Sequence, residues 1–374
     1  MPSNEPSPNR PRIERLWRRD LPAPLLPIWA GLAAAAGLYR AGVAARHLYW
    51  RMMKRRAPVL TVSVGNLTVG GNGKTPFTLF LARRLQSHGL RVGIVSRGYQ
   101  RARSKARAEL VADGGALKIS LEDAGDEPAM MAKSFTGPIA VARRRLDGIE
   151  LLSKLGPLDA VILDDGFQHV RLNRDVDLVL VSNERGFGNG WMIPAGPMRE
   201  PIRAVGRADA IVVMNFGTGA SAIRPSQMKK LTARKIFHAS VRPRALLVAE
   251  NGVWRETPLG LGGRRVLAVS GLADSSAFYA MLRELDADLV GVFDYPDHHA
   301  YTNADWQAMV NAMRDTDLVV TTEKDLVKLE RFPFPRDSLY ALRLEVTMDA
   351  ADTRALDELI LGRMTATAAA SAHA

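Results

Sequence analysis

The residues with the clearest chemical meaning form a glycine-rich turn between an apolar segment and a Lys-Thr pair. Residues 58–76 read PVLTVSVGNLTVGGNGKTP. The β-branched stretch at 58–64 predicts a buried strand, and a helical pattern begins at Pro76. Strand, glycine loop, Lys-Thr and helix are the parts of a phosphate-binding loop. Backbone N–H groups at the helix start would bind phosphate, Lys74 would neutralise its charge and the Thr75 hydroxyl would bind Mg²⁺.

This loop departs from the pattern G-x-x-x-x-G-K-[ST] at one position. The pattern requires glycine five residues before Gly73, where the chain has Thr68. A glycine-rich hairpin with an incidental Lys-Thr is the alternative, but the strand before and the helix after argue against it. The residues predicted to bind nucleotide are Thr68, Val69, Gly70, Gly71, Asn72, Gly73, Lys74 and Thr75.

Two acidic residues give a second signal downstream. Residues 160–163 (AVIL) predict a buried strand, and Asp164 and Asp165 follow it directly. In phosphate-loop proteins, a carboxylate at such a strand end approaches Mg²⁺ directly or through water. We expect this pair to support the metal, and the sequence leaves open which of the two touches it.

The nucleotide and the phosphoryl acceptor are the next questions. An N-K-x-D motif after a late strand, typical of GTPases, is missing, which favours ATP. If water accepts the phosphoryl group, the protein is an NTPase used as a switch or a chaperone. If a hydroxyl accepts it, the protein is a kinase, and a carboxylate is expected near the γ-phosphate.

The composition describes a globular chain with excess positive charge. The 374 residues suffice for two domains, and 47% hydrophobic with 24% charged residues argue against disorder. The lack of cysteine excludes disulfides, thiolate metal sites and cysteine nucleophiles, and it suits a reducing cytoplasm. The net charge of +12 indicates an anionic partner: nucleic acid, a phospholipid surface or a phosphorylated substrate.

Two-thirds of this charge lies in the first 57 residues, which hold eleven basic and three acidic residues. Residues 21–39 are uncharged, but three prolines spoil the first third as helix. About 12 uncharged residues then remain before Arg40, fewer than the roughly 20 that span a bilayer. Aromatic and arginine residues on a helix from Ile28 to about Arg51 favour the headgroup layer of an anionic membrane. A soluble packing helix and a single span are the alternatives.

The pattern of strands and helices predicts an α/β fold in five segments. A basic arm with the membrane-associated helix (1–57) precedes a P-loop domain (58–216). A linker (217–244) leads to a second α/β domain (245–364), and an Ala-rich, disordered tail (365–374) follows.

Seven motifs between residues 58 and 325 carry a family resemblance. They are SVGNLTVGGNGKTP (63–76), SRGY (96–99), GDEP (125–128), LDDGFQH (163–169), GPMRE (196–200), PDHHAYT (296–302) and TTEKD (321–325). In this order they resemble the tetraacyldisaccharide 4′-kinase family of lipid A biosynthesis. Thr68 is normal for this family and no longer counts against the loop.

The resemblance implies a lipid kinase. It would transfer the γ-phosphate of ATP to the 4′-hydroxyl of a tetraacylated glucosamine disaccharide 1-phosphate, giving lipid IVA. It would work at the cytoplasmic face of the inner membrane, as a peripheral protein or with a single N-terminal anchor. The implied fold has two α/β domains with a cleft between them, a P-loop NTPase-like sheet that binds ATP and a smaller Rossmann-like sheet.

The resemblance also assigns site residues. Asp126 would accept the proton of the sugar hydroxyl, and His298, from the second domain, would pair with it. By themselves the residues leave Asp126 as a helix cap and His298 as a surface histidine. Further motif positions near the site are Arg97, Tyr99, Gln168, His169, Arg199 and Glu200. A nucleic-acid-binding protein is a weaker alternative, because the excess charge lies in the N-terminal arm, and no obligate protein partner is expected.

Overall fold

In this computed structural model, the structure describes Trp17 and residues 26–98, 106–114, 116–217, 219–250 and 253–372. Residues 1–16 and 18–25 of the N-terminal arm, the candidate residue Tyr99 and the last two residues of the tail lie outside the described residues.

The described helices alternate with the strands along the chain. They are α2 (Leu26–Met52), α3 (Lys74–Ser87), α4 (Leu121–Ala124), α5 (Asp126–Ser134), α6 (Arg145–Ser153), α7 (Pro225–Leu231), α8 (Ser276–Glu284), α9 (Asn303–Ala312), α10 (Glu323–Leu329) and α11 (Ala350–Ala372), with 3-10 turns η2 (Ile202–Arg207) and η3 (Met313–Asp315).

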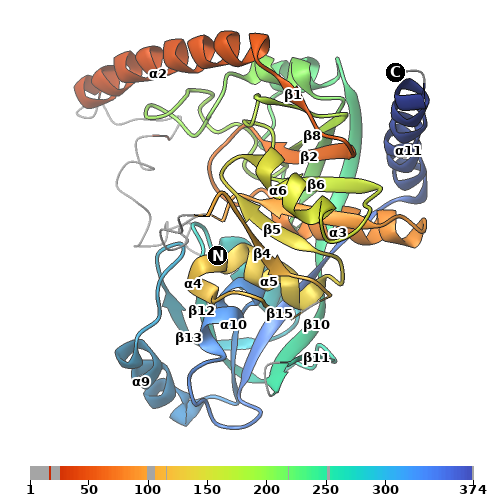
Figure 1. Ribbon diagram of the computed structural model, residues 1–374. Coiled ribbons are helices and arrows are strands. Elements are labelled where there is room, and N and C mark those ends of the chain that lie inside the picture. The colour runs from red at the N-terminus through yellow and green to blue at the C-terminus, as the bar shows by residue number, and fades with distance from the viewer. Residues whose placement is uncertain are drawn as a thin grey trace.

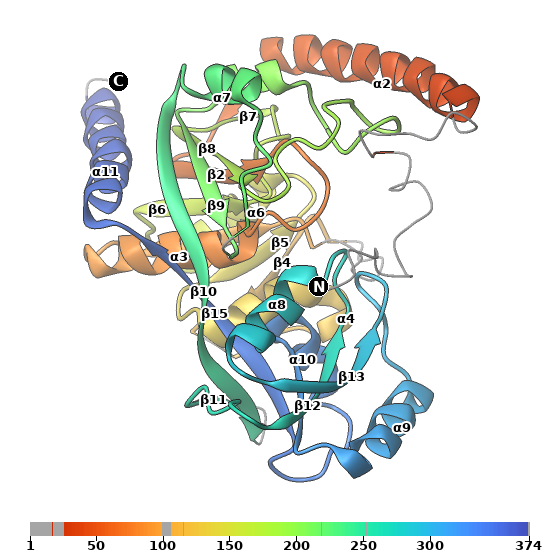
Figure 2. The same ribbon diagram turned by 180° about the vertical axis from the view of Figure 1, so that it is seen from behind.

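Thirteen strands of the described residues form one mixed sheet (Figures 1 and 2). They are β2 (Leu60–Asn66), β3 (Val92–Ser96), β4 (Ala108–Ala112), β5 (Ile139–Ala142), β6 (Ala160–Asp164), β8 (Val176–Ser182), β9 (Ala210–Asn215), β10 (Lys235–Glu250), β11 (Val253–Thr257), β12 (Arg265–Ser270), β13 (Asp288–Asp294), β14 (Leu318–Thr322) and β15 (Leu339–Met348). Their order is β13-β12-β14-β15-β10-β9-β8-β2-β6-β3-β5-β4, and β11 pairs with β10. Two short strands, β1 (Arg55–Arg56) and β7 (Leu172–Asn173), pair separately.

The centre of the first half is a parallel sheet buried on both faces. Every residue of β2, β6 and β8 is buried, as expected for apolar strands covered by helices on each side. Alternate residues of β6 face opposite layers. Ile162 joins the core cluster of Phe77 from α3, whereas Leu163 joins that of Ile149 from α6.

The register of the two central strands determines where the site forms. β2 pairs in parallel with β6, and Val64 lies opposite Asp164. Because the carboxyl ends of parallel strands meet at one edge of a sheet, the loop after β2 and the acidic pair after β6 emerge together. The two strongest sequence signals are therefore neighbours in space.

A long strand joins the two halves of the molecule. β10 pairs in parallel with β9 over Lys235–Ser240 and in antiparallel with β15 along most of its length. The stretch 217–244, predicted as a linker, contains α7 and the first part of this strand. Phe237, Ala239 and Val241 are buried at alternate positions, a strand pattern that the linker interpretation overlooked. The division into two domains stays a prediction.

The ends of the chain are helical where the structure describes them. α11 continues to Ala372 and so overlaps the tail predicted to be disordered from Thr365. At the other end, α2 agrees with the helix expected from Ile28 to Arg51. It lies along one edge of the molecule, far from α9 and β13 (Figures 1 and 2). By length and composition Pro27–Met52 could cross a membrane, and little of it is buried, so length does not exclude a span.

Candidate active site

The phosphate-binding loop links β2 to α3 through a glycine that no other residue replaces easily. Gly73 precedes the helix with a φ of 71°, in the left-handed region that favours glycine. A Cβ built there would lie 2.9 Å from Cζ of Phe216 and 3.0 Å from Cε of Met214. α3 follows with 14 residues, so its first N–H groups and the positive end of its dipole face the loop.

Lys74 lies between the loop and the acidic strand end. Its Nζ is 3.2 Å from Oδ1 of Asp165 and 3.3 Å from Oδ1 of Asn66. Asp165 also accepts a hydrogen bond of 2.9 Å from Nη1 of Arg199. Burial alone would raise the pKa of Asp165, but the charges of Lys74 and Arg199 hold it well below its usual range. Asp165 is therefore a carboxylate already held by two cations.

Asp164 has a different environment. Its carboxylate accepts hydrogen bonds from the hydroxyls of Thr78 at 3.4 Å and Ser96 at 3.2 Å. The side chain is buried, and burial, followed by the charge of Glu127, raises its pKa to about 7. A cation placed beside this carboxyl would favour its ionised form. Of the two acidic residues, Asp164 is therefore the one whose ionised form a bound cation would stabilise.

The structure fits the donor set that Mg²⁺ uses with a nucleotide. Among the described residues, no three acidic or histidine side chains converge as a metal cluster of their own. Mg²⁺ in kinase sites usually takes one or two carboxylates together with phosphate oxygens and water. Thr75, Asp164 and Asp165 all line one cavity and can supply that protein share.

Asp126 and His298 meet across the two halves of the chain. Nδ1 of His298 lies 3.2 Å from Oδ2 of Asp126, although 172 residues separate them. Asp126 is the first residue of α5, and His298 has a φ of 60°, a strained conformation that is often found at functional sites. Burial opposes ionisation of Asp126, but hydrogen bonds from His298 and Lys328 and the charge of Lys328 leave its pKa below the usual value.

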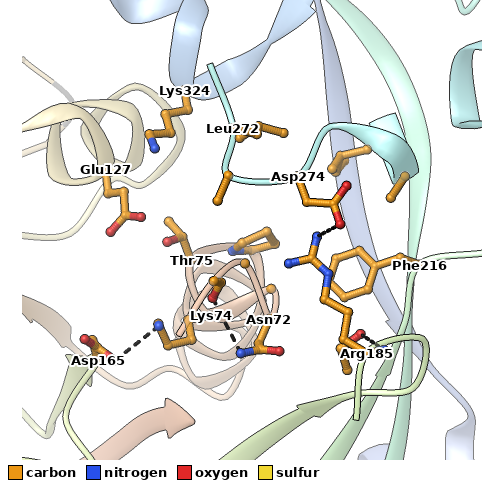
Figure 3. A pocket seen from close by; sticks show the side chains of 18 of the residues that line it. Asn72, Lys74, Thr75, Glu127, Asp165, Arg185, Phe216, Leu272, Asp274 and Lys324 are labelled. Atoms are coloured by element: carbon orange, nitrogen blue, oxygen red, sulfur yellow. Dashed lines mark hydrogen bonds and ion pairs between the residues drawn. The ribbon is translucent and has the colours of Figure 1, made fainter. Parts of the chain in front are cut away.

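One cavity of about 1810 Å³ connects these groups. Its lining comes from both halves and includes the phosphate-binding loop, Asp164, Asp165 and His298. Figure 3 shows Lys74, Thr75 and Asp165 on one side of it and Lys324, Leu272 and Asp274 on the other. The predicted residues Arg97, Gln168, His169 and Arg199 also line it. Asp126 is not among the described residues that line the cavity, but it contacts His298, which is.

Gln168 and His169 lie beside the loop. Nε2 of Gln168 donates to the carbonyl of Asn66 at 2.7 Å, and its Oε1 lies 3.4 Å from Nη1 of Arg199. Burial, followed by the charge of Arg145, lowers the pKa of His169 to about 3. His169 is therefore neutral near pH 7 and can take part in hydrogen bonding but not in charge pairing.

Comparison with known proteins identifies the family to which this chain belongs. The model of tetraacyldisaccharide-1-P 4′-kinase matches residues 28–365. The chain belongs to this kinase family. The tetraacyldisaccharide 4′-kinase of Syntrophus aciditrophicus is 36% identical over 374 residues, covering 95% of this chain and 98% of that one. The enzyme of Syntrophobacter fumaroxidans is 38% identical over 338 residues, covering 86% and 85%.

A solved structure agrees with the family and the fold. LpxK from Aquifex aeolicus in complex with ATP matches with a TM-score of 0.71 at 31% identity, over 91% of this chain and 99% of that one. The predicted α/β fold and the predicted resemblance to the tetraacyldisaccharide 4′-kinases are both confirmed.

Several residues that line the cavity of this kinase family member were not predicted from its sequence. Glu127 lines the cavity and faces Lys74 and Thr75 in Figure 3. Arg145 is buried, and its guanidinium donates to the carbonyls of Ala142 and Asp164 at 2.9 Å each. Three consecutive arginines, 143–145, gave no signal as to which one turns inward.

Glu200 is not among the described residues that line the cavity, and its expected supporting role near the site stays a prediction. It is buried, and Arg207 donates to its two oxygens at 2.7 and 3.1 Å. Nε2 of His47 in α2 lies 3.4 Å away. The contact with α2 gives Glu200 a structural place: it connects the N-terminal helix to the first half.

The buried position of Glu200 leads to a stability prediction. Glu200→Ala removes the carboxylate that accepts two hydrogen bonds from the partly exposed Arg207 and should lower the free energy of unfolding by about 2 kcal/mol. Urea denaturation measures this loss. The exposed pair of Arg244 and Glu345 is the control, because Glu345→Ala should cost under about 1 kcal/mol. Equal effects of the two substitutions would contradict the assignment.

Proposed function

We propose that this protein transfers the γ-phosphate of ATP to the 4′-hydroxyl of a tetraacyldisaccharide 1-phosphate, forming lipid IVA. One observation carries the proposal: Lys74 of the phosphate-binding loop and His298 of the second half line the same cavity, with Asp126 bound to His298. A triphosphate and an incoming hydroxyl can therefore meet between them.

The loop and the acidic edge hold the nucleotide in this proposal. N–H groups at the start of α3 bind the phosphates, Lys74 balances their charge, and the Thr75 hydroxyl with Asp164 holds Mg²⁺. We favour Asp164 over Asp165 because Lys74 and Arg199 already hold Asp165. When bound, Mg²⁺ would neutralise charge that develops on the phosphate oxygens. Arg97, Gln168, His169 and Arg199 are proposed to contact the sugar and its phosphate.

His298 is proposed as the group that takes the proton. As the 4′-oxygen bonds to the γ-phosphorus and the bond to the ADP oxygen breaks, the hydroxyl proton must leave. His298 lines the cavity, whereas Asp126 does not. The pKa of Asp126 lies below its usual value, so it stays ionised and is a weak base but a good partner for an imidazolium. This reverses the roles that the resemblance suggested within the pair.

One assay tests the reaction directly. The protein is incubated with labelled ATP, Mg²⁺ and the disaccharide lipid in detergent micelles. We expect a doubly phosphorylated lipid and little release of free phosphate. Phosphate release at the same rate with and without the lipid would instead support an NTPase switch or chaperone.

The N-terminal helix is proposed to bring the enzyme to its lipid at the cytoplasmic face of the inner membrane. Several large apolar side chains of α2 are exposed, among them Leu38 at 79% and Leu48 at 67%. Arg40, Arg46 and Arg51 lie along the same helix. Apolar and cationic side chains together fit an anionic leaflet.

Charged substitutions on this helix test the membrane role. The double variant Leu38→Glu/Leu48→Glu should reduce partitioning to anionic vesicles on the order of 100-fold, because it removes two leucines from the apolar layer. ATP binding should be unchanged. Leu155→Glu, at another exposed leucine outside α2, is the control and should bind vesicles like the wild type. Unchanged partitioning of the double variant would contradict the role.

A further inference from the structure

Lys328 of α10 occupies an unusual place for a lysine. It is 5% exposed, and its ammonium has three oxygen partners. Nζ lies 3.2 Å from Oδ2 of Asp126, 3.1 Å from Oδ1 of Asp325 and 3.0 Å from the carbonyl of His299. It also lies 5.2 Å from the ring centre of Tyr301. The ammonium therefore donates a hydrogen bond to the carbonyl of His299 and forms ion pairs with Asp126 and Asp325, and such partners compensate for the burial of its charge.

Lys328 and His298 bind the same oxygen. Oδ2 of Asp126 lies 3.2 Å from Nζ of Lys328 and 3.2 Å from Nδ1 of His298. Asp126 belongs to the first half of the chain, and its two partners belong to the second. The position of this one oxygen therefore depends on Lys328 as much as on His298.

Asp325 fixes Lys328 from behind. Asp325 is fully buried, and its Oδ2 accepts hydrogen bonds from the backbone N–H of Gly271 at 2.8 Å and from the hydroxyl of Thr322 at 2.7 Å. A Cβ at Gly271 would approach Oδ1 of Asp325 to 2.8 Å, so the strand end fits closely around this carboxylate. Lys328 is thus held in a rigid part of the second half.

We propose that Lys328 is a positioning residue for phosphoryl transfer: it fixes the carboxylate of Asp126, and through it His298, when the two halves are in contact. The inference rests on the proposed roles of Asp126 and His298. Lys328 is not among the described residues that line the cavity, so it acts through Asp126 and not on the substrate.

The charges around Asp126 explain how Lys328 contributes. The charged or titratable groups of the elements packed around it are Glu323, Lys324, Asp325 and Lys328 of α10, Tyr295, Asp297, His298, His299 and Tyr301 of the loop before α9, Glu127 and Lys133 of α5, and Glu122 and Asp123 of α4. With neutral His298, the ammonium balances one of the two carboxylates of Asp126 and Asp325.

Loss of Lys328 should therefore change the pH dependence as well as the rate. Burial raises and Lys328 lowers the pKa of Asp126, so a neutral side chain at 328 lets this pKa rise. Asp126 would then take a proton at a higher pH than in the wild type. The acidic limb of the kcat profile should move to higher pH, an effect that a purely structural lysine would not produce.

The experiment compares three variants in the lipid kinase assay. Lys328→Met should lower kcat by about 10- to 100-fold, the range found for outer-shell partners of active groups, with little change in KM for ATP. Lys328→Arg, which keeps the charge, should recover part of the rate. Lys133→Met is the matched control, because Lys133 of α5 pairs with Glu330 at the end of α10 at 3.0 Å and so bridges the same two helices without touching Asp126.

Combination with Asp126→Asn separates the possible failures. If Lys328 acts through Asp126, Lys328→Met should cause little further loss in the Asp126→Asn background. The inference is wrong if Lys328→Met and Lys133→Met lose activity equally and neither shifts the pH profile. It is also wrong if the loss in the double variant Lys328→Met/Asp126→Asn equals the sum of the two single losses in activation free energy. If Asp126→Asn itself keeps full activity, the proposed catalytic pair is wrong instead. If Lys328→Met does not fold, the kcat pH profile of the double variant Lys328→Arg/Asp126→Asn is compared with that of Asp126→Asn. We expect the two profiles to coincide, and a shift between them would overturn the inference.

Discussion

His298→Ala should lower kcat by about 10²- to 10⁴-fold, the contribution of a positioned general base. The ring lines the cavity and its Nδ1 is held by Asp126, so removal takes away the group that accepts the hydroxyl proton. ATP binding should survive, because the loop at Gly73–Thr75 is untouched. Single-turnover kinetics with labelled ATP and the lipid substrate would measure the loss.

The neighbouring residue supplies a matched control. His299 stacks on Tyr295, with ring centres 4.5 Å apart, and its Nε2 lies 3.1 Å from Asp305. His299→Ala keeps the backbone carbonyl that Lys328 uses, so kcat should change little. The double variant Asp126→Ala/His298→Ala should be about as slow as His298→Ala alone, because the two act as a unit. Turnover near the wild-type rate in His298→Ala would remove the pair from the mechanism.

Lys74→Met should have the other large effect, a loss of about 10²- to 10³-fold in kcat/KM for ATP, as for removal of one preorganised charge at the reacting phosphates. In contrast to His298→Ala, this variant should also bind ATP more weakly. Stability should remain close to that of the wild type, because Asp165 keeps Arg199 as a partner at 2.9 Å. Calorimetric titration with ATP and a thermal denaturation curve measure the two quantities.

Lys154→Met is the control for this substitution. Lys154 is exposed at the end of α6 and should tolerate the change in both assays. Unaltered ATP affinity in Lys74→Met would mean that the glycine turn is a hairpin and not a phosphate-binding loop.

Local sequence was enough to predict the nucleotide side of the site. The strand, turn and helix at 58–76 are contiguous, so their geometry follows from residues close together in the chain. Asp164 and Asp165 were predictable for the same reason, since they end a short apolar strand. Parallel pairing of β2 with β6 then brings the two segments to one edge, which the α/β pattern implies.

At two places, proximity in the chain and composition did not convey how residues are arranged in space. Glu200 follows Arg199 in the chain, yet Arg199 lines the cavity while Glu200 is buried against Arg207 and His47. The stretch 217–244, predicted as a linker, contains the start of β10, which buries Phe237, Ala239 and Val241 at alternate positions.

The sequence by itself determined the α/β class, the phosphate-binding loop and the acidic strand end, because each depends on interactions within a few residues. Tertiary structure decided that His298 and Lys328 both contact one oxygen of Asp126 and that two cations hold Asp165. These contacts join segments up to about two hundred residues apart. They form only when packing of the whole sheet brings its two halves together, and no local pattern of residue types encodes that distance.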